Sequence, residues 1–295
     1  MNKLHYVSAA NEAAAQVVLF GANSTRASHA PSHQTASGVD RSIFSADFAR
    51  DAENESPSLS EKMVLGDHVY DAGNLIMPEK KFAQVKTMFD HFDKLFNDKK
   101  IPICLGGDHL VKYAGLSALF KHHPDAYVIY LDAHPDCHMV NRLYYGSILH
   151  HVLKENKTTP NHIVLTGLRQ ATAKEKIGYD FYAMPTIFGL DFAMHSLKEI
   201  FETIQQMIPT GKHVYFSVDL DGFDPADTPG VEQPCPGGPK VNDFLALLHL
   251  MSTKYRFAGM DITEFLPSID KQKLTALAMM RIVKEFASIP INPSS

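Results

Sequence analysis

Short apolar runs alternate with amphipathic segments along this chain. Residues 126–131 (A-Y-V-I-Y-L) form an apolar run with β-branched and aromatic side chains, which is typical of a strand buried on both faces. Comparable runs predict further strands at residues 16–22, 101–105, 161–168, 213–218 and 256–260. A weaker run predicts one more strand at residues 63–69.

Amphipathic helices separate these runs. Residues 79–97 are the clearest case, because Phe82, Val85, Phe89 and Phe92 recur at spacings of three and four with charged residues between them. The same kind of spacing predicts helices at residues 148–155, 196–207, 241–252 and 271–287. Ser196, with Glu199 three residues later, is a typical start for the second of these.

Strands that alternate with helices predict a parallel sheet covered by helices on both faces. The sequence has no linker and no break in composition, so we expect one domain over residues 1–295. Residues 23–39 are predicted to form a long loop that carries His29 and His33. Residues 222–239 are predicted to form a rigid loop, because proline fixes the backbone there.

Composition excludes several kinds of partner. The net charge of −5 gives no basic surface for nucleic acid, and no apolar run approaches the ~20 residues that span a membrane. Residues before Glu12 lack the apolar core of a signal peptide. Cys104, Cys137 and Cys235 are widely spaced without a C-x-x-C pair, which favours a reducing compartment. We therefore expect a cytoplasmic protein that binds neither nucleic acid nor membranes.

Ionisable side chains follow four of the predicted strands. Asp132, His134 and Asp136 come directly after residues 126–131, and their spacing of two directs extended side chains to one side. The other groups after strands are His109, the pair Asp219 and Asp221, and the pair Asp261 and Glu264. Ligands of open parallel sheets bind at the carboxyl ends of the strands, so these side chains are expected to converge.

Carboxylate oxygens together with imidazole nitrogens suit a divalent first-row ion such as Mn²⁺, Zn²⁺, Fe²⁺ or Ni²⁺. Six such ligands are about what two metal ions need, and two close ions can hold a bridging hydroxide at neutral pH. For any one strand end, an ordinary polar loop with solvated carboxylates is the alternative.

At these strand ends the sequence resembles the ureohydrolases, the family that contains arginase, agmatinase, other guanidino-acid hydrolases and formiminoglutamase. Five stretches occur in the family's order: G-G-D-H (106–109), D-A-H-P-D (132–136), S-V-D-L-D-G-F-D-P (217–225), P-G-V-E-Q-P-C-P-G-G (229–238) and D-I-T-E-F-L-P (261–267).

The resemblance implies a three-layer α/β/α fold with a central parallel sheet, as in arginase, and two Mn²⁺ ions per subunit. One ion would be held by His109, Asp132, Asp136 and Asp219. The other would be held by Asp132, His134, Asp219 and Asp221. Ni²⁺, Fe²⁺ and Co²⁺ remain compatible with these ligands.

The resemblance also implies a reaction. Asp136 would accept a hydrogen bond from the bridging hydroxide, and Glu264 would pair with the guanidinium of a small guanidino substrate such as agmatine, arginine or a guanidino acid. Hydroxide attack on the central carbon would release urea and an amine. Members of the family form trimers or hexamers, so a homo-oligomer is expected.

The proton shuttle departs from the family's pattern. In arginases and agmatinases a His-Gly pair follows the aspartate motif, and its histidine is thought to shuttle protons. Aligning Gly146 with that glycine places Tyr145 where the histidine stands. A tyrosine with the ordinary pKa of about 10 is a poor shuttle. His138 is therefore a candidate replacement, and the alternative for His138 is a loop histidine that supports the ligands or the substrate.

Other departures concern the substrate. Asn141 and Leu143 align with the serine and asparagine that hold the amino-acid end of arginine in arginases. This weakens the assignment of arginine as the substrate and makes Asn141 a candidate substrate contact. Arg169 belongs to a G-L-R stretch similar to the G-I-R of agmatinase-type members. Glu232 and Gln233 replace a commoner Gly-Thr pair, so the pocket wall is expected to differ.

The leading hypothesis is therefore a manganese amidinohydrolase of broadly agmatinase-like type. A formimino hydrolase that releases formamide is one alternative, and a catalytically silent metal-binding protein is the other. The residues that read the substrate's tail are expected in loops at 23–39, 141–147 and 174–185. Cys137, beside Asp136, is interpreted as a packing residue rather than a reactive thiol.

Overall fold

The computed structural model describes residues 9, 11–24, 68–156 and 158–289. The predicted loop with His29 and His33 lies outside this part from residue 25 onward. The predicted strand at 63–69 lies outside it up to residue 67.

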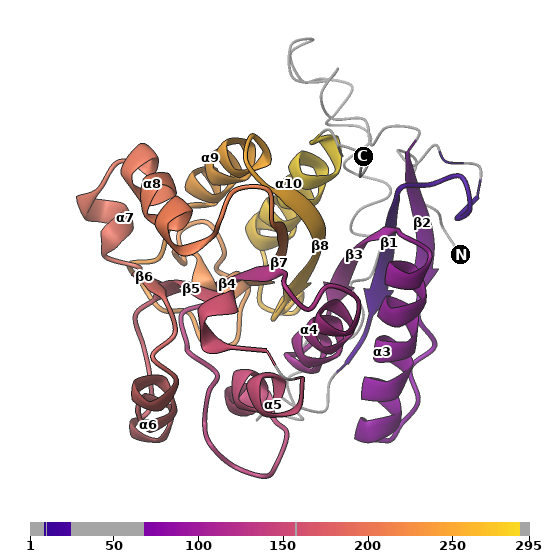
Figure 1. Ribbon diagram of the computed structural model, residues 1–295, viewed down its shortest axis with the longest axis horizontal. Coiled ribbons are helices and arrows are strands. Elements are labelled where there is room, and N and C mark those ends of the chain that lie inside the picture. The colour runs from indigo at the N-terminus through magenta and orange to yellow at the C-terminus, as the bar shows by residue number, and fades with distance from the viewer. Residues whose placement is uncertain (1–8, 10, 25–67, 157, 290–295) are drawn as a thin grey trace.

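Within the described residues, one eight-stranded sheet has the order β2-β1-β3-β8-β7-β4-β5-β6, with every neighbouring pair parallel (Figure 1). The strands are β1 (Val17–Ala22), β2 (Val69–Asn74), β3 (Ile101–Gly106), β4 (Tyr127–Leu131), β5 (Ile163–Leu168), β6 (Thr186–Phe188), β7 (His213–Asp219) and β8 (Arg256–Thr263). This confirms the parallel sheet; β2 begins where the weak prediction ended, and the short edge strand β6 was not predicted.

Helices cover both faces of the sheet, which confirms the three-layer arrangement (Figure 1). The helices are α3 (Lys81–Asn97), α4 (Leu110–His122), α5 (Ile148–Glu155), α6 (Ala173–Tyr182), α7 (Asp191–Met194), α8 (Leu197–Met207), α9 (Val241–Ser252) and α10 (Leu274–Ser288). Helices α3, α4 and α5 pack on one face, and α8, α9 and α10 pack on the other.

Alternate residues of each central strand enter different cores. In β1, Val17 and Leu19 belong to the core on the face that α8, α9 and α10 cover, whereas Val18 and Phe20 belong to the core on the face that α3 and α4 cover. All four side chains are fully buried, which explains why the strand reads as a continuous apolar run. Each contributes about 1.5–3 kcal/mol relative to an exposed position.

The register of the strands brings the carboxyl ends of four of them together at one edge of the sheet. Leu105 of β3 pairs with Ile262 of β8, Asp219 of β7 pairs with Thr263 of β8, and Val218 of β7 pairs with Leu131 of β4. The residues that follow β3, β8, β7 and β4 therefore emerge side by side at the centre of the sheet.

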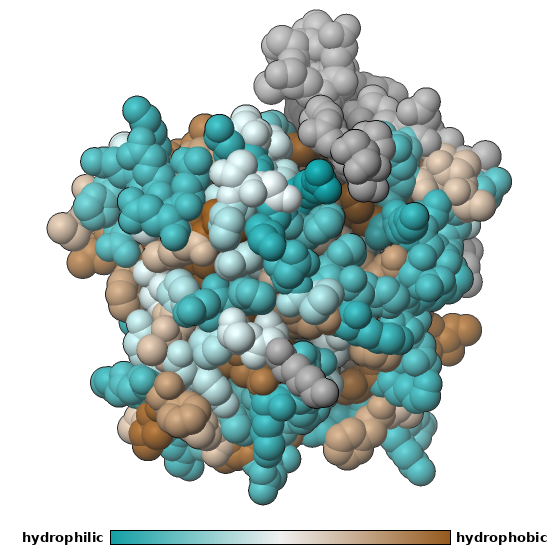
Figure 2. All heavy atoms as spheres, viewed as in Figure 1, coloured by the Kyte–Doolittle hydropathy of each residue, from teal (hydrophilic) through white to brown (hydrophobic). Residues whose placement is uncertain are grey.

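The outer surface is mixed. Hydrophilic side chains predominate on the face shown in Figure 2, with apolar residues scattered between them. None of the helices in the described part of the chain combines the length and the apolar character needed to span a membrane.

Candidate metal centre

A tight turn after β3 places the first histidine. At Gly107 a Cβ atom would lie 2.0 Å from the Ser24 carbonyl oxygen, so only glycine fits this close approach. The Gly107 carbonyl accepts a hydrogen bond from the Glu264 backbone N–H at 2.9 Å. This bond fixes the end of β8 against the turn that leads into His109.

His109 faces three carboxylates. Its Nε2 atom lies 3.0 Å from Asp136 Oδ2, 3.0 Å from Asp219 Oδ2 and 3.6 Å from Asp132 Oδ2. All four side chains are buried. We call these four residues the His109 site; they are the four that the sequence predicted around one ion.

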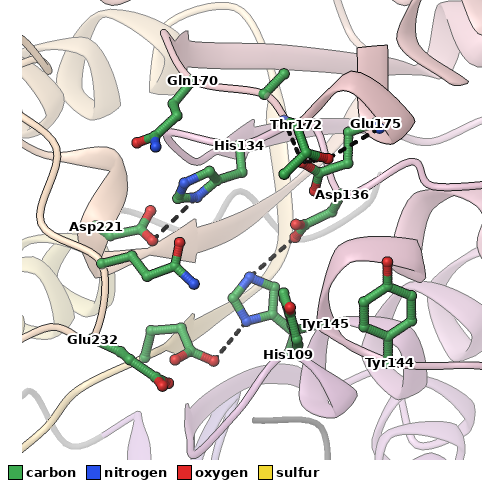
Figure 3. A pocket seen from close by; sticks show the side chains of 13 residues that line it. His109, His134, Asp136, Tyr144, Tyr145, Gln170, Thr172, Glu175, Asp221 and Glu232 are labelled. Atoms are coloured by element: carbon green, nitrogen blue, oxygen red, sulfur yellow. Dashed lines mark hydrogen bonds and ion pairs between the residues drawn. The ribbon is translucent and has the colours of Figure 1, made fainter. Parts of the chain in front are cut away.

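His134 forms a second group with Asp132 and Asp221, and Figure 3 shows its contact with Asp221. Its Nδ1 atom lies 3.3 Å from Asp221 Oδ2 and 3.4 Å from Asp132 Oδ1. Asp219 adjoins the group, because its Oδ1 atom accepts the Asp221 backbone N–H at 2.9 Å. We call Asp132, His134 and Asp221 the His134 site. The six predicted ligands are thus brought together in two adjoining groups that share Asp132.

Lys112 enters the same cluster from α4 and was missed from the sequence. Its side chain is fully buried, and its Nζ atom lies 2.6 Å from Asp132 Oδ2 and 3.0 Å from Asp219 Oδ2. The signal was present, because Lys112 is a lone charge in an apolar run and lies three residues after His109, on the same side of a helix.

Glu264 lies against the other nitrogen of His109. Its Oε1 atom is 2.6 Å from His109 Nδ1. Two residues of the cluster have backbones in the left-handed region, Asp136 at φ 44° and Glu264 at φ 66°. Such conformations cost of order 1–3 kcal/mol each and are concentrated at functional sites.

Burial and neighbouring negative charges raise the pKa of two carboxyl groups in the cluster. Burial, with the negative charge of Asp132, raises the pKa of Asp136 to about 6 although His109 and Lys112 oppose the rise. Burial, with the charges of Asp219 and Asp108, raises the pKa of Glu264 to about 7. These carboxyl groups exchange protons near neutral pH.

In the His134 site, the pKa of Asp132 is lowered and that of His134 is raised. Burial also raises the pKa of Asp132, but Lys112, His109 and His134 outweigh it and hold that pKa well below its usual range. Burial lowers the pKa of His134, yet Asp132 and Asp221 raise it to about 12. The surroundings of His134 therefore favour a positive charge.

A cavity of about 280 Å³ opens onto the cluster (Figure 3). Five carboxylates line it, and none of the described residues that line it is a lysine or an arginine. Its lining residues are His109, His134, Asp136, Tyr144, Tyr145, Gln170, Ala171, Thr172, Glu175, Asp221, Glu232, Gln233 and Glu264. The predicted difference at Glu232 and Gln233 thus falls on the pocket wall.

Helix α6 supplies pocket residues that the sequence prediction treated as loop. Thr172 caps the helix. The carboxylate of Glu175, three residues later, accepts hydrogen bonds from the Thr172 backbone N–H and hydroxyl. Threonine with glutamate three residues on is the same signal that predicted the helix after Ser196. Helix α4 escaped prediction for another reason: it is buried on most sides and has no polar stripe.

The candidate shuttle and substrate residues lie at different distances from the pocket. Tyr145 lines it, with its ring centroid 6.4 Å from that of His109. His138 is not among the lining residues, but its Nδ1 atom contacts the hydroxyl of Tyr144, which lines the pocket. Asn141 is exposed and lies outside the lining, so its role as a substrate contact stays a prediction.

Cys137 and Arg169 support the site from outside. The Cys137 thiol is buried against α6, and burial with the charges of Asp136 and Glu175 raises its pKa. This supports its interpretation as a packing residue. The Arg169 guanidinium donates to the carbonyls of Gly167, Asp221, Gly222, Phe223 and Cys235. It therefore fastens the rigid loop after β7 beside the cluster.

The donor chemistry fits metal binding, though unequally. The His134 site offers carboxylate oxygens and an imidazole nitrogen, the set that divalent first-row ions accept. The His109 site offers the same donors, but with the Lys112 amine among its oxygens. Fold and cluster together define an α/β protein of the kind that carries a candidate metal-binding group at the carboxyl edge of its sheet.

The chain belongs to the arginase family, whose sequence profile matches residues 16–288. It is similar to an agmatinase of Halalkalibacterium halodurans, 28% identical over 225 residues with 73% of each chain covered. It is also similar to an arginase of Staphylococcus aureus, 25% identical over 252 residues with 74% of this chain and 83% of the other covered.

The fold is shared with a solved structure of a hypothetical agmatinase from Burkholderia thailandensis. The TM-score is 0.79 at 21% identity, with 93% of this chain and 85% of the other covered. These findings confirm the resemblance and the predicted enzyme class, a hydrolase acting on linear amidines.

Proposed function

We propose that this protein is a metal-dependent amidinohydrolase that cleaves a small guanidino compound with a cationic or neutral tail into urea and an amine. The acidic pocket carries this proposal. Five carboxylates line it without a lysine or arginine among the described lining residues, so a cationic substrate is attracted and a carboxylate tail is repelled.

Glu264 is placed to bind the guanidinium. It lines the pocket and is held by His109, and a carboxylate matches the planar fork of a guanidinium bidentately. Approach of a cation favours the charged form of Glu264, whose pKa of about 7 otherwise leaves it partly protonated at neutral pH. The relatives named agmatinase and arginase support a guanidino substrate.

The remaining chemistry divides between metal and protein. A divalent ion held by Asp132, His134 and Asp221, with Asp219 beside them, would supply Lewis acidity and a water ionised at neutral pH. The Asp136 carboxylate lines the pocket and, with its pKa of about 6, accepts a proton from the attacking water and returns it to the departing amine. Mn²⁺ is the ion that family membership favours; Ni²⁺, Fe²⁺ and Co²⁺ stay compatible.

The acidic pocket argues against one alternative, and the backbone conformations at the site argue against the other. Formiminoglutamate carries two carboxylates, and five acidic side chains oppose their entry. A silent metal-binding protein would not need Glu264 and Asp136 in strained backbone conformations beside the six ligands.

Urea release tests the proposal. Mn²⁺-loaded protein would be assayed with agmatine, arginine, guanidinobutyrate, guanidinopropionate and guanidine, and we expect agmatine to be preferred over the guanidino acids. Removing one partner of a buried charge pair costs about 2–5 kcal/mol, so Glu264→Gln should lower kcat/KM about 30- to 4,000-fold. Asp219→Asn should abolish turnover.

Two results would contradict the proposal. Preference for guanidinobutyrate over agmatine would remove the argument from the acidic pocket. Silence across the panel, with formamide released from formiminoglutamate, would establish the first alternative. Cytoplasmic location and a homo-oligomeric state stay predictions; a sizing column with light scattering checks the second.

A further inference from the structure

A protein cation already lies in the His109 site. The ammonium group of Lys112 reaches it from the first turn of α4, inside a cluster where His109, Asp132, Asp136 and Asp219 would otherwise surround a metal ion. We infer that Lys112 takes the place of one of the two ions, so that this chain binds a single divalent ion per subunit, at the His134 site.

The strongest observation is the identity of the atoms involved. His109 Nε2 faces Asp132 Oδ2, Asp136 Oδ2 and Asp219 Oδ2. Lys112 Nζ faces the same three oxygens, at 2.6, 3.9 and 3.0 Å. A first-row ion binds oxygen at about 2.0–2.2 Å. An ion in the His109 site would therefore compete with the ammonium for the same lone pairs, as a like charge within a few ångströms.

The surroundings of Lys112 are built for an ammonium. The ring of Tyr130 lies 4.4 Å below the amine, and the Tyr130 hydroxyl is 3.3 Å from it. Two carboxylate oxygens, Asp132 Oδ2 and Asp219 Oδ2, lie 2.6 and 3.0 Å from the amine. A fully buried lysine is stable only when its charge is paired in this way.

Other donors occupy the same oxygens. The Tyr130 hydroxyl donates to Asp136 Oδ2 at 2.6 Å, and the Thr263 hydroxyl donates to Asp219 Oδ2 at 3.3 Å. An ion that entered here would have to displace these bonds in addition to the ammonium, and the buried donors left behind would lose their partners.

The His134 site presents different atoms. His134 Nδ1 faces Asp132 Oδ1 and Asp221 Oδ2, whereas the contacts of Lys112 with the aspartates are all made to the Oδ2 atoms of Asp132, Asp136 and Asp219. Asp132 can thus bind an ion through one oxygen while Lys112 binds the other. In this arrangement His109 is a positioning residue that holds Glu264 rather than a metal ligand.

Metal stoichiometry tests the inference, which rests on the proposed metal dependence but not on the substrate. Protein loaded with Mn²⁺ alone would be examined by elemental analysis, native mass spectrometry and electron paramagnetic resonance. We expect one ion per subunit and no spin-coupled signal. Asp221→Asn should lose the ion, whereas His109→Asn should keep it. Two ions in the unmodified protein, or loss of the ion in His109→Asn, would overturn the inference.

Variants of Lys112 provide the second arm. Lys112→Ala removes the ammonium and leaves space beside three carboxylates, so we expect it to bind two ions. Lys112→Arg keeps the charge and should stay at one. Lys284→Ala, which shortens a buried lysine on α10, is the matched control and should also stay at one. A folded Lys112→Ala protein, checked by circular dichroism, that still binds one ion would show that Lys112 does not set the stoichiometry.

The two proposals fail separately. Two ions with urea release would overturn the role of Lys112 and leave the proposed function intact. One ion without urea or formamide release would overturn the function and leave the stoichiometry intact.

Discussion

The Asp132 carboxylate has different partners on its two oxygens. Oδ2 accepts a hydrogen bond from Lys112 at 2.6 Å, and Oδ1 accepts the His134 backbone N–H at 2.7 Å and faces the His134 ring. The position of Asp132 after a buried strand predicted it as a metal ligand, and the resemblance to the ureohydrolases implied that two ions share it. The partner on Oδ2 was not predicted, because Lys112 meets Asp132 only through the packing of α4 on the sheet.

A tyrosine connects the pocket with His138. Tyr144 lines the pocket, and its hydroxyl contacts His138 Nδ1 behind the wall. If protons leave or enter along this path, His138→Asn and Tyr144→Phe should each lower kcat about tenfold or more, and the double variant should lose no more than either single one, since the two act as a unit.

Steady-state kinetics of the three variants, with KM and kcat separated, check this prediction. Tyr145→Phe tests the second tyrosine of the pocket wall, whose ring lies edge-on to that of Tyr144 at 4.9 Å. Near-normal turnover in His138→Asn would exclude this histidine as the shuttle.

Asp261 shows how burial makes stability depend on pH. It lies fully buried in β8, accepts a hydrogen bond from Ser217 at 3.0 Å, and burial raises its pKa from 3.8 to about 6. The folded protein therefore binds more protons than the unfolded chain between about pH 4 and 6, so this group's contribution to stability falls as pH rises through that window.

We expect Asp261→Asn to be more stable than the unmodified protein above pH 6, by about 1–3 kcal/mol, because about two pKa units correspond to about 3 kcal/mol at most. Below pH 4 the two proteins should differ little. Urea unfolding at pH 4.5 and pH 8 measures the difference, and a stability difference that is the same at both pH values would contradict the assignment.

At the scale of elements, a glycine in α6 allows this helix to approach the loop after β4 closely. A Cβ atom at Gly178 would lie 1.9 Å from the Cys137 carbonyl oxygen, so Gly178→Ala must displace the helix. Its first turn carries Glu175 into the pocket. We expect the variant to lose about 1–3 kcal/mol of stability and to show a raised KM.

Unfolding curves and substrate kinetics check this prediction together. Lys174→Ala, an exposed change on the same helix, should leave both quantities unchanged. An unaltered KM in a destabilised Gly178→Ala protein would show that the position of α6 does not matter for substrate binding.

Helices with an apolar stripe and strands with a continuous apolar run were predictable, and elements with neither were not. Helix α8 has an apolar stripe and a serine cap, and its predicted range of 196–207 differs from the observed Leu197–Met207 by one residue. The buried α4 lacks such a stripe, and the three-residue β6 is too short for any period to show. The strand ends predicted the centre of the site, while its walls depend on α6 and on turns that tertiary packing sets.

At the scale of the whole molecule, the metal is expected to act as a ligand of the folded state. At a free Mn²⁺ concentration 100 times the Kd, binding adds about 2.7 kcal/mol to the free energy of unfolding. For a chain of this size we expect Tm to rise by about 5 °C. Thermal unfolding with chelator and then with added Mn²⁺ measures the effect.

Asp221→Asn is the control for this prediction, because it removes a ligand of the His134 site. It should show no Mn²⁺-dependent rise in Tm. An equal rise in this variant would place the ion elsewhere in the molecule.

The layered architecture followed from the alternation of strands and helices, but the order of the strands did not. Placing β3 and β8 side by side, from opposite ends of the chain, joins His109 to Glu264 across 155 positions. The strand ends predicted that both residues converge on one site, but not that β3 and β8 are neighbours or that the two side chains are in contact.

The left-handed backbones at Asp136 and Glu264 have a consequence for how this protein can be improved. Glycine relieves such strain, so replacing either residue by glycine would relax the fold while removing a group that the proposed reaction uses. A laboratory selection for heat resistance alone would therefore enrich inactive proteins, and only a selection that also demands turnover would retain these two side chains.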